Sequence, residues 1–198
     1  MRTASPSAWF RLLGRNARDL ALLLKIGPRL KDDNRRLLET IVFPALRSDP
    51  AIHRLLFVGC HWYTWHYKDV FRDEEFWTID VAPQQARYGS SRHIIDSVEH
   101  VERHFACLSL DVVMLIGVIG WGLDDPAVIE GSLAACHAVL REGGLLMLGC
   151  DEVPDHTPTD LARSPTLHRM QPFAFPGLGA ARYRCGGELQ HTCLFFTK

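Results

Sequence analysis

The feature that most constrains the fold of this 198-residue chain is a series of short apolar segments between residues 55 and 148. Uninterrupted apolar runs of this length are typical of strands that are buried on both faces of a parallel sheet. We predict five such strands, over residues 55–58, 76–79, 93–95, 110–116 and 145–148.

Helical patterns separate these strands. We predict helical segments over residues 64–71 and 97–105, and a longer helix that begins at Asp124-Asp125-Pro126, because acidic caps and an early proline favour helix starts. This helix should end at Arg141-Glu142, where Gly143-Gly144 follows. Alternating strands and helices predict a doubly wound, mostly parallel sheet, here of seven strands. Residues 182–185 and 191–196 flank Gly186-Gly187 and predict a C-terminal antiparallel hairpin.

The first 52 residues have a different pattern, which predicts a helical extension. One helix is expected to include residues 19–25. A second should begin near Asp32-Asp33, be interrupted by Pro44 and end at Ser48-Asp49-Pro50. We therefore expect a helical extension over residues 1–52 and an α/β domain over residues 53–198.

Several classes of protein are excluded or disfavoured by composition. No apolar run reaches the roughly 18 residues of a membrane-spanning helix. The six cysteines form no Cys-x-x-Cys pair, so we expect free thiols, no metal site and a cytoplasmic location. Neither a Gly-x-Ser-x-Gly motif nor a phosphate-binding Walker loop is present.

Ligands of open parallel sheets bind outside the carboxyl ends of the strands. The residues at these positions are Gly59-Cys60-His61-Trp62-Tyr63, Asp80, Asp96-Ser97 and the segment 117–121. Asp80 follows Gly59 by about twenty residues, so its carboxylate is placed to accept hydrogen bonds from ribose hydroxyls; the alternative is a turn or cap residue. Asp96 is expected either to face an adenine amino group or to cap the next helix with Ser97.

The order of these elements resembles the Rossmann-type (class I) S-adenosylmethionine-dependent methyltransferase superfamily. The segment Leu140-Arg141-Glu142-Gly143-Gly144-Leu145-Leu146 and the terminal hairpin carry part of this resemblance, which covers residues 55–198. It implies S-adenosylmethionine as cofactor and S-adenosylhomocysteine as product. The residues expected to contact the cofactor are Gly59, Cys60, His61, Tyr63, Asp80, Val81, Asp96, Ser97 and Gly117.

The first loop departs from the superfamily pattern. Members usually have Gly-x-Gly-x-Gly there, whereas this chain keeps only Gly59. A non-catalytic module of the same fold that binds the cofactor or a nucleotide is therefore the main alternative to a methyltransferase. An NAD(P)-dependent oxidoreductase would also place an acid after the second strand, but it would require Gly-x-Gly-x-x-Gly, which is missing.

The methyl acceptor is expected to be a small molecule. The Asn-Pro-Pro-Tyr signature of many amide and base N-methyltransferases is absent after the fourth strand, which argues against DNA bases, and we expect no nucleic-acid partner. Tyr63, His66 and Trp121 are predicted to line the acceptor pocket, which the N-terminal helices and the proline-rich connection after Cys150 should cover. Methyl transfer depends mainly on alignment of the nucleophile, so no catalytic acid or base is predicted.

Overall fold

Eight strands form one sheet in the parts of the chain that the computed structural model describes, which are residues 30, 32–153, 160–186 and 190–198. The strand order is β3-β2-β1-β4-β5-β8-β6, and β7 also pairs with β8. The first five strands are parallel and β8 is antiparallel to β5, so the predicted fold class is confirmed. The strands are β1 (Arg54–Val58), β2 (Glu75–Asp80), β3 (Arg92–Ile95), β4 (Leu110–Ile116), β5 (Leu140–Asp151), β6 (Gln171–Pro172), β7 (Arg182–Arg184) and β8 (His191–Thr197).

The sheet has seven positions although eight strands are described. Strands β6 and β7 both pair antiparallel with β8, but with different parts of it: β6 with Phe196 and Thr197, and β7 with residues 192–194. The two short strands therefore share one place at the edge of the sheet. The hairpin predicted from the sequence is formed by β7 and β8.

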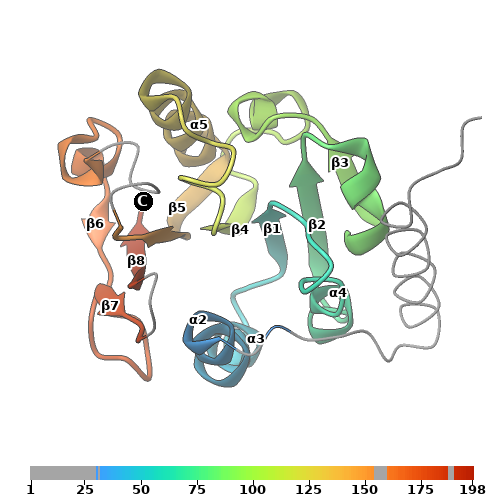
Figure 1. Ribbon diagram of the computed structural model, residues 1–198, viewed down its shortest axis with the longest axis horizontal. Helices are drawn as coiled ribbons and strands as arrows, with labels where there is room; N and C mark the ends of the chain where they lie inside the picture. Colours follow the sequence, from blue (N-terminus) through green and yellow to red (C-terminus); the bar gives the residue numbers. More distant parts are fainter. Residues whose placement is uncertain (1–29, 31, 154–159, 187–189) are drawn as a thin grey trace, which may run out of the picture.

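Helical segments cover both faces of the sheet (Figure 1). Helix α5 (Pro126–Val139) and the 3₁₀ segment η3 (Val98–Arg103) pack on one face, where Val113 and Leu133 belong to the same buried cluster. On the other face, Phe43 and Met114 belong to a second cluster. The helices there are α2 (Asp33–Leu37), η1 (Leu38–Val42), α3 (Phe43–Ser48) and α4 (Tyr67–Val70). Short 3₁₀ segments complete the described elements: η2 (Pro83–Tyr88), η5 (Leu161–Arg163) and η6 (Leu167–Arg169).

The predicted helix near residues 32–48 is present as a continuous helical run. Its interruption is a π-helical segment, η1, which lies directly before the first turn of α3. Pro44 has no backbone N–H to donate to the preceding turn, and a π-helical turn is a common adjustment in a helix. The backbone N–H of Phe43 accordingly bonds to the carbonyl of Leu38. The helix predicted at residues 19–25 lies outside the described residues, and the boundary at residue 52 stays a prediction.

The predicted end of the long helix at Arg141-Glu142 is wrong. Helix α5 starts as expected, with Asp125 accepting from the backbone N–H groups of Ala127 and Val128, but it ends at Val139. The chain then enters β5, because Leu140 already pairs with Leu110 of β4. The ammonium group of Lys198 also donates to the carbonyls of His137 and Leu140, which satisfies part of the helix end. Long-range pairing thus overrides the glycine pair as the stop signal.

Three further expectations concern the cysteines, membrane-spanning helices and metal sites. All six cysteines are free thiols, as expected. In the described ranges, no helix is both long and apolar enough to cross a membrane. Within those same ranges, no cluster of three or more His, Cys, Asp or Glu side chains is arranged to hold a metal ion.

Candidate functional site

A large cavity opens at the carboxyl ends of β1, β2 and β4. Its volume is about 1070 Å³, which slightly exceeds the usual range for small-molecule sites. The loops after these three strands line it, together with the start of the helical run at residues 32–35 and the facing ends of β5 and β8. The cavity therefore lies where an open parallel sheet is expected to bind ligands.

Gly59 marks the point where β1 turns beneath the cavity. Its φ of 82° lies in the left-handed region that favours glycine. A Cβ atom at this position would also meet Cγ1 of Val118 at 2.4 Å. Both the backbone conformation and the close approach of the fourth-strand loop therefore require glycine here, although the other two glycines of the expected pattern are missing.

The Asp80 carboxylate joins the ends of the first two strands. Its Oδ2 accepts from the backbone N–H of Cys60 at 2.7 Å, and its Oδ1 accepts from the backbone N–H of Ala82 at 2.8 Å. A carboxylate has about four lone-pair positions, so each oxygen keeps capacity for a further donor. Asp80 stabilises the turn, as the alternative interpretation expected, and it also presents acceptor positions to the cavity.

Asp96 and Ser97 line the same cavity beyond β3. Ser97 caps η3 by accepting from the backbone N–H of Glu99. The Asp96 carboxylate lies 2.9 Å from Nδ1 of His100 and 2.9 Å from Nε2 of His104. These hydrogen bonds lower the pKa of Asp96 well below its usual range. Capping is therefore realised by Ser97, whereas Asp96 is held by two imidazoles.

The nine residues predicted to contact a cofactor all line this cavity, and so do Tyr63 and Trp121 of the predicted acceptor pocket. Burial, with a contribution from Asp80, raises the pKa of the Cys60 thiol to about 12. The thiol is therefore protonated at neutral pH and is not a nucleophile. The structure brings the predicted residues together, but their roles stay predictions.

His66 is the exception among the predicted pocket residues. It does not line the cavity, and only 3% of its surface is exposed. Its Nε2 lies 2.9 Å from Oε1 of Glu39, beneath the helical run. The prediction of His66 as a pocket residue is corrected: its imidazole packs between Trp65 and Tyr67 in the interior.

Trp121 is connected to a buried pair of side chains at the ends of β5 and β8. Its indole Nε1 donates to Oδ2 of Asp151 at 2.7 Å, while 52% of the residue is exposed. Oδ1 of Asp151 lies 2.6 Å from Nδ1 of His191, which is its register partner across the two strands. This chain of contacts fixes the orientation of the indole at the rim of the cavity.

Arg35 is a charged side chain in the wall of the cavity, although only 4% of it is exposed. Its Nη1 donates to the hydroxyl of Tyr67 at 3.3 Å, and its guanidinium carbon lies 4.6 Å from the ring centre of Tyr63. Burial acts to lower the pKa of Arg35, but interactions with Tyr67, Tyr63 and Asp32 outweigh it, so its pKa lies above the ordinary value. The guanidinium therefore keeps its charge.

Sequence reasoning missed Arg35, Asp151 and His191. Asp151 carried a usable signal, since it follows an apolar strand in the same way as Asp80. The position of His191 beside Asp151 could have been predicted only from the register in which β8 pairs with β5. No pattern distinguished Arg35 from a solvent-exposed helix residue, because charged residues are rarely buried in helices.

Neither a scan against protein-family models nor a search of curated proteins finds a match. Similar solved structures include the N-methyltransferase NodS from Bradyrhizobium japonicum WM9, with 16% sequence identity and a TM-score of 0.59 over 83% of this chain and 96% of that one. An S-adenosylmethionine-dependent methyltransferase from Archaeoglobus fulgidus gives 12% identity and a TM-score of 0.56 over 83% and 94% of the two chains.

A further similar structure is 1,6-didemethyltoxoflavin-N1-methyltransferase of Burkholderia thailandensis, with bound 1,6-didemethyltoxoflavin and S-adenosylhomocysteine. It shares 14% identity and a TM-score of 0.53 over 100% of this chain and 92% of that one. At these identities the likeness concerns the fold, and the fold-level resemblance expected from the sequence is confirmed. The chain has the fold of the S-adenosylmethionine-dependent methyltransferases.

Proposed function

We propose that this protein binds S-adenosylmethionine and transfers its methyl group to a small-molecule acceptor, leaving S-adenosylhomocysteine. The observation that carries the proposal is the Asp80 carboxylate, which sits in the cavity wall next to Gly59 and keeps acceptor positions free beyond its two turn contacts. A carboxylate at the end of the second strand is suited to bind both hydroxyls of a ribose.

The cofactor is oriented by the two sides of the crevice. With its ribose at Asp80, the adenine extends toward Val81 and Asp96, which line the cavity beyond β2 and β3. In the strand order, β3 lies on one side of β2, and β1 and β4 lie on the other. With the adenine on the β3 side, the sulfonium end points toward Gly59, after β1, and Gly117, after β4. This orientation leaves the methyl group near the fourth-strand loop.

The acceptor site lies between Tyr63 and Trp121 in this proposal. Two aromatic walls suit a small or planar molecule, and the cavity volume leaves room beside a nucleoside. One structural neighbour bears on the class of acceptor. It is a Thermus thermophilus 16S rRNA methyltransferase, solved with S-adenosylmethionine and guanosine, and the match covers 38% of that chain. That the acceptor is a small molecule and not a nucleic acid stays a prediction, and so does the cytoplasmic location.

Titration calorimetry tests the cofactor. The protein is expected to bind S-adenosylmethionine and S-adenosylhomocysteine, and not NADH. Binding of NADH with no response to either sulfur nucleoside contradicts the proposal and favours the oxidoreductase alternative.

The single glycine of the first loop supports a second candidate, a module that binds the cofactor without transferring methyl. Incubation with methyl-labelled S-adenosylmethionine and a cell extract's small-molecule fraction separates the two. A methyltransferase produces a labelled small molecule, whereas a binding module produces none despite measurable cofactor affinity.

A further inference from the structure

Arg35 carries a buried charge that has no carboxylate partner among the described residues. Its side-chain hydrogen bond goes to the Tyr67 hydroxyl, and its guanidinium lies over the face of the Tyr63 ring. Asp32 accepts from the backbone N–H of Arg35 at 2.6 Å but forms no ion pair with its guanidinium. The positive charge in the cavity wall is therefore not neutralised within this part of the protein.

An unpaired buried charge is unfavourable, so buried charges in native proteins are normally paired. A guanidinium can bind a carboxylate with two parallel hydrogen bonds, and the edge formed by Nε and Nη2 is suited to this. Nε is buried, and within the described ranges it has no hydrogen-bond partner. This edge is therefore suited to bind an anion.

The guanidinium of Arg35 lies near the loops that follow β1 and β4. Tyr63, beneath the guanidinium, belongs to the loop after β1. Gly117 follows β4, and a Cβ atom added to it would lie 3.5 Å from Nη2 of Arg35. Since β1 separates β2 from β4, Arg35 lies across the crevice from Asp80. A ligand whose ribose is at Asp80 therefore places its other end near Arg35.

We propose that Arg35 is an anion site of the cavity that binds a carboxylate. Two sources offer this group: the amino-acid part of the cofactor and a carboxylate on the methyl acceptor. The first source rests on the proposed function, whereas the requirement for an anion rests on the unpaired guanidinium alone. Arg36, the next residue of the same helix, is exposed and outside the cavity, and it provides a matched control.

The test compares S-adenosylhomocysteine with 5′-methylthioadenosine, which keeps the nucleoside and sulfur but lacks the amino-acid part. For Arg35→Gln, calorimetry should show about a ten- to hundredfold loss of affinity for S-adenosylhomocysteine, and an unchanged affinity for 5′-methylthioadenosine. Arg36→Gln should bind both ligands as the parent does. This result assigns the carboxylate to the cofactor.

The acceptor arm uses benzoate as the probe, titrated into protein saturated with S-adenosylhomocysteine, with chloride as the ionic-strength control. Benzoate binding that disappears in Arg35→Gln, without a change in S-adenosylhomocysteine affinity, assigns the site to the acceptor. The proposal is overturned if Arg35→Gln alters neither S-adenosylhomocysteine affinity nor benzoate binding. If the parent binds neither nucleoside, the proposed function fails, but benzoate titrated into the ligand-free protein still decides the anion site.

A stability measurement keeps the inference testable if Arg35→Gln does not fold. Replacing a buried ion pair by apolar side chains of similar volume is often neutral or stabilising, and a buried charge without an acidic partner is itself destabilising. Arg35→Met should therefore leave the Tm of the ligand-free protein unchanged or higher, and should reduce the increase in Tm that S-adenosylhomocysteine produces in the parent. A Tm lowered by several degrees, with the ligand-induced increase intact, assigns Arg35 to structural support and contradicts the proposal.

Discussion

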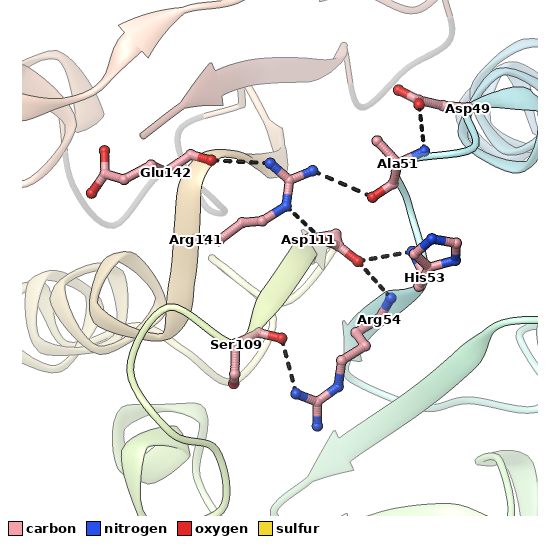
Figure 2. A network of polar contacts seen from close by, with 8 residues as sticks. All are labelled: Asp49, Ala51, His53, Arg54, Ser109, Asp111, Arg141 and Glu142. Atoms are coloured by element: carbon pink, nitrogen blue, oxygen red, sulfur yellow. Dashed lines mark hydrogen bonds and ion pairs between the residues drawn. The ribbon is translucent and has the colours of Figure 1, made fainter.

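The two ends of the parallel sheet use charged residues differently. At the amino end, Oδ2 of Asp111 accepts from the backbone N–H groups of His53 and Arg54 at 2.8 and 2.7 Å, and Oδ1 accepts from Nε of Arg141 at 2.6 Å (Figure 2). At the carboxyl end, Arg35 has no such acid among the described residues: its Nη1 donates to the hydroxyl of Tyr67, and its Nε has no hydrogen-bond partner there.

The amino-end charges stabilise the sheet, whereas the charge of Arg35 is proposed to bind a ligand. The amino-end arginines find acids within the chain: Arg141 pairs with Asp111, and Nε of Arg54 lies 3.1 Å from Glu75. Their interactions connect β1, β2, β4 and β5 without any ligand. Arg35 lines a cavity of about 1070 Å³, and in our proposal a bound ligand supplies its missing partner. Polar groups without partners in a native interior call for such an explanation.

The largest expected effect on stability comes from the amino end. Asp111→Ala removes three hydrogen bonds and leaves the Arg141 guanidinium without its acid, so we expect it to lower the free energy of unfolding by about 2–3 kcal/mol. Urea denaturation measures this loss. S-adenosylhomocysteine affinity of the folded fraction should not change. A variant as stable as the parent breaks the comparison, because the amino-end network then contributes nothing.

The next largest effect is expected at the cavity rim. Trp121→Ala removes the proposed acceptor wall, so methyl transfer should fall about ten- to a hundredfold through loss of alignment. Cofactor affinity should stay within twofold of the parent. Kinetics with an identified acceptor and calorimetry with S-adenosylhomocysteine provide the two measurements. If cofactor binding is lost to the same degree as methyl transfer, or the protein unfolds, Trp121 belongs to the cofactor site or to the core.

A smaller effect concerns acid stability. Burial acts to raise the pKa of Asp111, but Arg141 and the backbone N–H groups of His53 and Arg54 outweigh it, so its pKa is lowered in the folded protein. A carboxylate with a depressed pKa contributes stability above the unfolded-state pKa, which is about 3.9 for Asp. This contribution is lost as the pH falls through the folded-state pKa. Asp111→Asn should therefore show a shallower loss of stability below about pH 4, measured by urea denaturation at several pH values. An identical pH dependence in both proteins excludes Asp111 as a source of the acid sensitivity.

Much of the fold was predictable because its signals are local. The buried parallel strands appear as apolar runs, and the start of α5 appears as an acidic cap before Pro126. Three features that the sequence did not predict depend on contacts between distant segments. The end of α5 is set by β4, the two short strands β6 and β7 are set by their pairing with β8, and His66 is buried by the helical run that contains Glu39.

The candidate site was predictable to the extent that it follows strand ends. Topology alone places Gly59, Asp80 and Gly117 at one edge of the sheet. Arg35 approaches this edge from a helix that precedes the sheet, and His191 reaches it from an antiparallel strand. Such contributions require the tertiary arrangement, because neither residue follows a parallel strand in the sequence.

The central claim is that the cavity binds a nucleoside cofactor through Asp80, and one binding measurement tests it most directly. Calorimetry compares S-adenosylhomocysteine affinity for the parent, Asp80→Asn and Asp73→Asn, where Asp73 is an acid outside the cavity whose side chain is 67% exposed. Asp80→Asn keeps a side-chain oxygen for the turn but loses the charge, so affinity should fall about ten- to a hundredfold, since hydrogen bonds to a charged acceptor contribute roughly 1.5–3 kcal/mol. Asp73→Asn should bind as the parent does. A folded Asp80→Asn protein with the parent's affinity would contradict the account and reduce Asp80 to a turn residue.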